Sequence, residues 1–176
     1  MSNQLVIAAL GQDRPGLVDK LSGWILDSGC NIADSRMMVL GGEFAVLLLV
    51  NGNWNSLAKL EGQLGQTEKQ LGMSISVKRT SKREQRGNLL PYAVDVVALD
   101  HPGIVHNLAG FFSRRSINIQ DLSTATYAAA HTGTMMFSVH MILDVPADTH
   151  IATLREEFLE FCDRLNLDAV IEPIKG

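Results

Sequence analysis

The sequence predicts an α+β fold of two βαββαβ modules in tandem, each an antiparallel four-stranded sheet with two helices on one face. Three observations predict it. A block of residues recurs at a fixed distance along the chain, strand-like and helix-like hydrophobic patterns follow the same order in both halves, and a charged segment separates the halves. The 176 residues, 46% of them hydrophobic, are enough for two small domains with a core each.

The recurring block is Asp13–Val18, which returns as Asp100–Val105, 87 residues later. Nine residues are identical between the halves at this offset. In the first half they are Asp13, Pro15, Gly16, Val18, Leu21, Gly23, Asn31, Ile32 and Asp34. Nine identities within about two dozen positions indicate that one module was duplicated.

The first module begins with a strand and a helix. The apolar run 5–10 is typical of a strand, and Gly11 ends it. Pro15 suits the first turn of a helix, where its missing N–H has no partner to lose. Apolar residues then recur at helical spacing over 17–28, and Gly29 ends the helix.

The rest of the first module is a hairpin, a second helix and a last strand. The strands 31–40 and 43–50 flank Gly41-Gly42, a dipeptide suited to a two-residue hairpin turn. Leucines at helical spacing over 57–71 mark one face of a helix, and 73–78 forms the closing strand.

The second module repeats this order. Its predicted elements are a strand over 93–99, a helix over 104–112, hairpin strands over 118–127 and 134–143, a helix over 151–165 and a strand over 169–173. The order βαββαβ, found twice, is that of the split-βαβ or ferredoxin-like arrangement. We therefore predict a first domain over 1–79, a charged linker over 80–91 and a second domain over 92–176.

Charge is distributed unevenly along the chain. Residues 1–77 sum to −2, residues 78–91 to +4 and residues 92–176 to −6. Because neither folded half offers a broad basic face, the sequence argues against autonomous nucleic-acid binding. The basic linker is typical of a hydrated spacer, with contact to DNA or to an acidic protein surface as the alternative.

Other features limit the class of protein. The first residues lack the basic and apolar regions of a secretory signal, and the apolar stretch 44–50 is too short to cross a bilayer. Cys30 and Cys162 lie in opposite halves, and neither the cysteines nor the histidines have metal-ligand spacing. We therefore expect a soluble cytoplasmic protein without a membrane contact, a disulfide or a metal.

The first strand-to-helix turn of each module is the most informative segment for function. A helix start exposes backbone N–H groups without internal partners, so it favours an anion such as a carboxylate. A glycine in each turn lets a ligand approach these amides closely. An acid and an amide in each module can accept hydrogen bonds from an ammonium group, which completes a site for an amino-acid zwitterion. The candidate ligand-binding residues are Asp13, Arg14, Pro15, Gly16, Leu17, Asn31, Ile32, Asp100, His101, Gly103, Ile104, Asn118 and Ile119.

A purely structural interpretation of these turns stays open. An Asp before a helix is often a side-chain cap, and Pro-Gly is often only a tight turn. The recurrence of both patterns at the same offset favours ligand binding, but a duplicated scaffold also keeps its capping residues.

The pattern of strand, Asp-Arg-Pro-Gly, helix, Asn-Ile-x-Asp-Ser-Arg and strand resembles an ACT domain. The segments 5–16, 29–36, 52–55 and 77–80 look closer still to the glycine cleavage system repressor family. This resemblance covers essentially the whole chain and is stronger in the first module.

The resemblance implies a function. ACT domains bind amino acids or related metabolites where two copies meet, so it implies glycine or a related amino acid as the effector, with no cofactor and no catalytic residue. It also implies a repressor that acts through a LysR-type transcriptional activator of the glycine cleavage genes and does not bind DNA itself. The second module departs from the pattern with His101 for Arg14, Ser116 for Gly29 and a longer turn over 128–133, so one or two ligand sites stay open.

Three other functions stay open on the residues. The first is an ACT-type sensor that regulates a different protein or enzyme. The second is an RNA-recognition-like module, which would need exposed aromatic residues on its central strands. A small enzyme is the third, although no set of nucleophile, base and orienting group is visible. Unpaired sheet edges also leave a homo-oligomer open beside a monomer.

Overall fold

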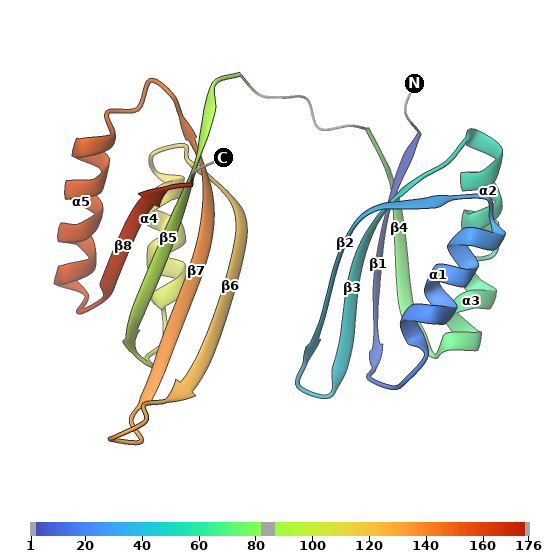
Figure 1. Cartoon of the computed structure of the whole chain (residues 1–176), viewed down its shortest axis with the longest axis horizontal. Coiled ribbons are helices and arrows are strands. Elements are labelled where there is room, and N and C mark those ends of the chain that lie inside the picture. The colour runs from blue at the N-terminus through green and yellow to red at the C-terminus, as the bar shows by residue number, and fades with distance from the viewer. Residues whose placement is uncertain (1–2, 82–86, 175–176) are drawn as a thin grey trace. The chain divides into compact units, whose positions relative to one another are not determined.

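The computed structural model describes residues 3–81 and 87–174. The chain forms two compact units, Met1–Glu84 and Gln85–Gly176, and each is described by itself. In each unit the helices lie on one face of a single sheet (Figure 1). The middle of the predicted linker, 82–86, lies outside the described residues.

The N-terminal unit contains four strands and three helices. They are β1 (Gln4–Gln12), α1 (Leu17–Asp27), β2 (Asn31–Leu40), β3 (Glu43–Asn51), α2 (Trp54–Gly62), α3 (Leu64–Leu71) and β4 (Met73–Thr80). The strands are ordered β2-β3-β1-β4 across the sheet, and every neighbouring pair is antiparallel. The first and last strands therefore lie side by side, as the split-βαβ arrangement requires.

The C-terminal unit repeats this topology. Its elements are β5 (Leu89–Leu99), α4 (Ile104–Ser113), β6 (Asn118–Ala128), β7 (Met135–Pro146), α5 (Ile151–Arg164) and β8 (Asp168–Pro173). The order β6-β7-β5-β8 is again antiparallel throughout. The fold class predicted from the sequence is confirmed in both units.

Alternation along the strands gives each sheet one buried face. In β1, Leu5 and Ile7 are fully buried against the helices, whereas Val6 and Ala8 between them face away. The C-terminal core adds a cluster of aromatic rings from α4 and α5, with centroids 5.1 to 5.2 Å apart. It consists of Phe111, Phe112, Phe158 and Phe161. Burial of these side chains is what holds the helices on the sheet.

A β-bulge occurs at the same place in both units. In β2, the partner on β3 advances by one residue while β2 passes from Ile32 to Asp34, so Ala33 is an additional residue. In β6 the same shift occurs between Ile119 and Asp121. The additional residue shifts the inward and outward alternation of side chains by one position. Ile32 therefore faces the helices, and Asp34, two residues later, faces away.

The second helix of the N-terminal unit differs from the prediction. The helix predicted over 57–71 is divided at Gln63 into α2 and α3. Gly62 and Gly65 flank the break, and glycine is a weak helix former because it loses the most backbone freedom. The hydroxyl of Ser28 on the neighbouring segment donates to the Gln63 side chain at 3.2 Å.

The strands beside the linker are longer than predicted. β4 runs to Thr80 and β5 begins at Leu89, so both extend into the range 80–91. Pro91 has no N–H to donate, but the ladder between β5 and β8 begins only at Tyr92, so the proline interrupts no pair there.

Candidate functional site

The start of α1 and the start of α4 have the same backbone geometry. Gly16 precedes α1 with φ 89° and ψ −2°, and Gly103 precedes α4 with φ 94° and ψ −3°. Both lie in the left-handed region, which glycine adopts without a steric penalty. We call residues 13–17 and 100–104 the helix-start turns.

No side chain caps either helix at these turns. Asp13 and Asp100 are therefore not the side-chain caps that the purely structural interpretation requires. Their backbone N–H groups donate instead to the hairpin of the same unit, Asp13 to the Gly42 carbonyl and Asp100 to the Met135 carbonyl, both at 3.0 Å. The hairpins thus anchor the turns, and both carboxylates stay exposed.

The space above each turn is open. A Cβ added at Gly16 would meet nothing within 4 Å, and one added at Gly103 would meet only the Asn107 side chain at 3.8 Å. A ligand can therefore reach the amides of the first helical turn. These turns lie on the surface. A crevice beside α1, lined in part by Val18 and Ile32, has a volume of only about 20 Å³, which is room for about one water molecule.

The two turns differ in charge. α1 carries Asp19 in its first turn, whereas α4 carries no acidic residue there. A negative side chain at a helix start competes with a bound anion for the same partial positive charge. The C-terminal turn is therefore the more favourable of the two for a carboxylate.

Arg14 and His101, which occupy equivalent positions, have different contacts. The Arg14 guanidinium donates to the Leu71 carbonyl at the end of α3, so it holds the last turn of that helix. The His101 ring lies 3.1 Å from the carbonyl of Pro102, its neighbour in the chain. Arg14 thus has a structural partner, which leaves it less free to contact a ligand.

The apolar residues that follow the two glycines belong to the core. Leu17 and Ile104 are each 2% exposed. Only their backbone N–H groups are available at the turn, while Pro15 beside them is exposed. Their side chains fix the helix start on the sheet and have no surface for a ligand.

The predicted amides lie at the far end of the sheet from the predicted acids. Asn31 pairs with Asn51, which pairs with Gln4 at the beginning of β1, whereas Asp13 follows the end of β1. Eight residue steps of a strand separate these levels, or roughly 26 Å. The C-terminal unit is alike, because Asn118 at the start of β6 is level with Asp144 near the end of β7.

One unit therefore does not assemble the predicted site. Glycine is far too short to touch Asp13 and Asn31 of the same unit at once. Identity at a fixed offset indicated that both residues matter to the module, but it carried no information on their separation.

A groove between α1 and α3 was not anticipated from the sequence. It has a volume of about 610 Å³ and is lined by polar side chains, among them Asp19, Lys20 and Gln70. Trp24 also lines it, and its indole Nε1 is buried with no hydrogen-bond partner. Gly23 was the available signal, because a glycine inside a helix leaves such a surface open.

The cysteines are not candidates for catalysis. Both are buried free thiols. Burial raises the pKa of Cys30, and burial together with the Asp163 carboxylate raises the pKa of Cys162 to about 12. A thiol that stays protonated is a poor nucleophile and a poor metal ligand. The described residues contain no group of three His, Cys, Asp or Glu side chains that could hold a metal ion.

The ACT domain family matches residues 3–78, and a second ACT family, like that of the small subunit of AHAS, matches residues 94–157. Over 170 residues the chain is 31% identical to the glycine cleavage system transcriptional repressor of Escherichia coli (strain K12), covering 97% of this chain and 90% of the relative. The chain belongs to this family of ACT-domain repressors. The family resemblance seen in the sequence is confirmed.

Solved structures agree with this ACT-domain assignment. A crystal structure attributed to a glycine cleavage system transcriptional repressor has a TM-score of 0.75 and 28% identity, covering 100% of this chain and 99% of the other. An unknown protein from Galdieria sulphuraria has a TM-score of 0.80 at 24% identity over 99% of this chain and 100% of its own, which shows a shared fold alone. The described part of this ACT-domain chain has no helix long and apolar enough to span a membrane.

Proposed function

We propose that this chain is a non-catalytic regulator that responds to glycine or a related amino acid and represses glycine cleavage genes. The relative from Escherichia coli is a transcriptional repressor of that system, and ACT domains cover both halves of this chain. The repressor acts through a partner protein, a LysR-type transcriptional activator, in the cytoplasm, and does not bind DNA itself.

One observation carries the sensing half of this proposal. Each unit presents a left-handed glycine, without a side-chain cap and with open space above it, at the start of a helix. This is the geometry that lets backbone amides receive a carboxylate. The exposed Asp13 and Asp100 carboxylates lie at these same turns and can accept hydrogen bonds from the ammonium group, whereas Asn31 lies roughly 26 Å from the turn of its own unit and takes no part there.

Binding of glycine alone must be weak. The best small ligands gain about 1.5 kcal/mol per heavy atom, so five atoms give at most about 7 to 8 kcal/mol. The dissociation constant is then micromolar or weaker. Glycine can change the repressor's affinity for its partner only if it binds one conformation better than another.

The uncovered face of the N-terminal sheet argues against a nucleic-acid binder. RNA-recognition modules stack bases on aromatic residues of the two central strands. The outward side chains of β1 and β3, such as Val6, Ala8, Leu47 and Leu49, include no aromatic residue within the described 3–81. Neither folded half has a net positive charge. A sensor that regulates another protein or enzyme remains the second candidate, because the ACT match fits it equally.

Calorimetry of the full chain with glycine, serine and alanine tests the sensing step. We expect saturable binding that G103N weakens at least tenfold, because Asn tolerates the left-handed backbone while its side chain fills the space above the amides. G133N is the matched control, since Gly133 is also left-handed (φ 66°) and open but lies in the β6–β7 turn. No saturable heat with any of the three amino acids would refute the sensor.

A separate assay tests the partner. The chain should co-elute with the purified activator of the glycine cleavage genes, and glycine should change the amount bound. A gel shift with the promoter DNA and without the activator should show no complex. If glycine binds but the activator does not, the sensor stands and its target is a different protein.

A further inference from the structure

The N-terminal sheet has one face that no helix covers. Cross-strand pairing places its outward side chains in three rows across β2, β3, β1 and β4. The rows are Asp34, Leu49, Val6 and Lys78; Arg36, Leu47, Ala8 and Ser76; and Met38, Ala45, Leu10 and Ser74. We call these residues the outer face.

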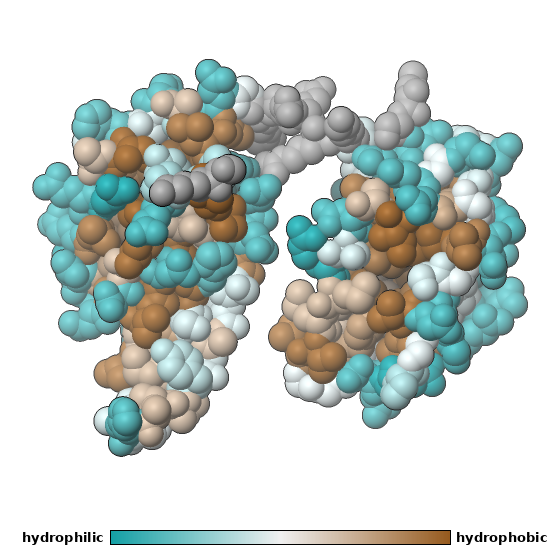
Figure 2. Space-filling view, viewed as in Figure 1, coloured by the Kyte–Doolittle hydropathy of each residue, from teal (hydrophilic) through white to brown (hydrophobic). Residues whose placement is uncertain are grey.

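The outer face is apolar and hollowed at its centre. Leu10 and Leu47 are each 52% exposed, and a cavity of about 520 Å³ lies between them over Ala8 and Ala45. Figure 2 shows hydrophobic residues gathered over the strands of this unit. Large exposed apolar side chains around a hollow mark a surface for another protein.

We propose that the outer face binds the outer face of a second copy of this chain, around a two-fold axis that runs parallel to the strands between β1 and β3. Such an axis places each row opposite the same row of the partner. Within a row, β2 then lies opposite the partner's β4, and β3 lies opposite the partner's β1. Leu47 then lies over the partner's Ala8, and Leu10 over the partner's Ala45. The large residues of each copy fill the hollows of the other, in an aligned packing of two sheets.

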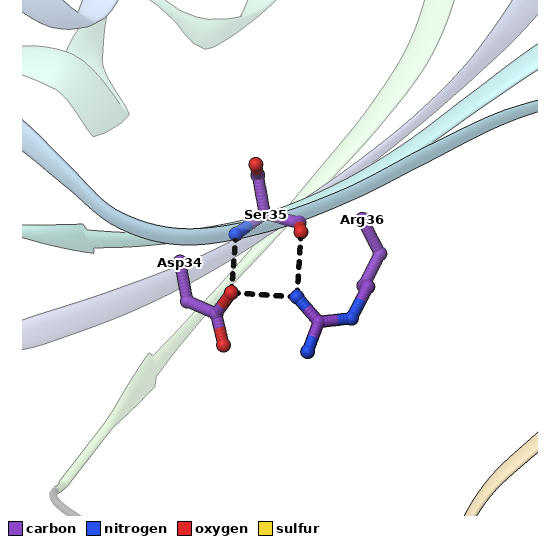
Figure 3. A network of polar contacts seen from close by, with 3 residues as sticks. All are labelled: Asp34, Ser35 and Arg36. Carbon is purple, nitrogen blue, oxygen red and sulfur yellow. Dashed lines mark hydrogen bonds and ion pairs between the residues drawn. The ribbon is translucent and has the colours of Figure 1, made fainter.

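Charge complementarity supports the same axis. It places Asp34, at one end of its row, opposite the partner's Lys78 at the other end, and the contact occurs twice. One oxygen of Asp34 accepts from the Ser35 N–H at 2.8 Å and from Arg36 at 2.7 Å, and the other takes part in none of the contacts drawn in Figure 3. These bonds hold the pKa of Asp34 below its ordinary value, so the carboxylate is charged at neutral pH. Lys78 is exposed and has no ion-pair partner within 3–81 and 87–174.

The C-terminal sheet provides an internal comparison. The row equivalent to that of Asp34 consists of Asp121, Ile142, Ala93 and Glu172. The same two-fold axis would place Asp121 opposite the partner's Glu172, and like charges repel. The uncovered face is therefore self-complementary in the N-terminal sheet and self-repelling in the C-terminal one.

The area is adequate for a weak dimer. Four strands about 4.8 Å apart, each about seven residues long, cover roughly 19 by 23 Å. Each copy thus contributes roughly 440 Å² if the face is treated as flat, and uneven side chains add to this area. The buried area is near the lower end of specific interfaces. The partner is a second copy, since both the charges and the sizes of the side chains match under one symmetry operation.

Sedimentation of the full chain from about 1 to 200 μM tests the proposal, because this range brackets a weak interface. We expect a monomer–dimer equilibrium that D34K weakens about tenfold and K78D weakens as much, since each turns two attractions into two repulsions. The double variant D34K/K78D should restore the wild-type constant within about threefold. An equimolar mixture of D34K and K78D should form a heterodimer more tightly than either variant pairs with itself.

The control variant E172K reverses a charge at the equivalent edge of the C-terminal sheet and should not weaken the dimer. L47D, placed at the centre of the outer face, should leave a monomer whose circular dichroism is unchanged. A wild-type chain that is monomeric at 200 μM would overturn the proposal. So would a dimer that D34K, K78D and L47D leave unaffected, or one that the double variant fails to restore.

Discussion

The left-handed turn at Gly16 predicts opposite effects for two glycine-to-alanine changes at the same helix. In G16A the new Cβ meets nothing within 4 Å, so the cost is the backbone strain at φ 89° and not a clash. That strain is about 1 to 2 kcal/mol, and a smaller loss of freedom in the unfolded chain offsets part of it. We expect a net destabilisation of about 1 kcal/mol.

Gly23 is the matched control, because it lies inside α1 with equally open space around it. Alanine is the better helix former by about 0.8 to 1 kcal/mol, so G23A should stabilise the unit by about that amount. The two variants then differ by about 2 kcal/mol, or roughly 30-fold in the unfolding equilibrium.

Urea unfolding followed by tryptophan fluorescence measures this difference. Both tryptophans, Trp24 and Trp54, lie in the N-terminal unit, so the signal reports on that unit alone. With a slope of about 1 kcal/mol per M for a domain of this size, each variant should move the midpoint by about 1 M, in opposite directions. A G16A chain as stable as the wild type, or more stable, would refute the left-handed conformation.

Three further predictions use other contacts. R14A removes the donor to the Leu71 carbonyl and should destabilise the N-terminal unit by about 1 kcal/mol in the same fluorescence assay, whereas H101A should change the stability of the C-terminal unit little when followed by hydrogen exchange; equal effects would contradict the assigned contacts. F158A empties a fully buried ring site and should cost the C-terminal unit about 3 to 5 kcal/mol by hydrogen exchange while the tryptophan transition stays unchanged. The Cys162 thiol has a pKa of about 12 when folded, above the ordinary value of 9.0, so the unfolded chain releases this proton first; the stability of the C-terminal unit should fall by about 1.4 kcal/mol per pH unit above pH 9, and C162A should make the slope for that unit, followed by hydrogen exchange, less steep by this amount.

The sequence was a good guide to the fold because the fold rests on local patterns. The alternation in β1 and β3 and the helical spacing from Leu17 onward each follow from burial of one face. Pro15 indicated the first helix start to within two residues, because α1 begins at Leu17 and the left-handed Gly16 lies between them. The limits of the elements were harder to predict, because they depend on neighbours. The break at Gln63 lies between two glycines and beside Ser28, and the start of β5 depends on its pairing with the end of β7.

The candidate site was harder to predict from the sequence than the fold. The pattern correctly located the two turns, but it placed Asp13 and Asn31 in one site although β1 separates them. Distances between segments depend on the direction in which the chain crosses the sheet, which no repeat offset contains. The bond from Arg14 to α3 was also invisible, because its acceptor is a backbone carbonyl 57 residues away.

The bulge shared by β2 and β6 has a consequence for the gene. Ala33 has no partner of its own on β3, so loss of its codon would leave Ile32 and Asp34 against the residues that they already face. Loss of any later codon in the strand would exchange inward and outward side chains along part of it. We therefore expect natural length variation in this hairpin to concentrate at codon 33. Codon 120 should tolerate it equally, because both halves inherited the additional residue from the ancestor that was duplicated.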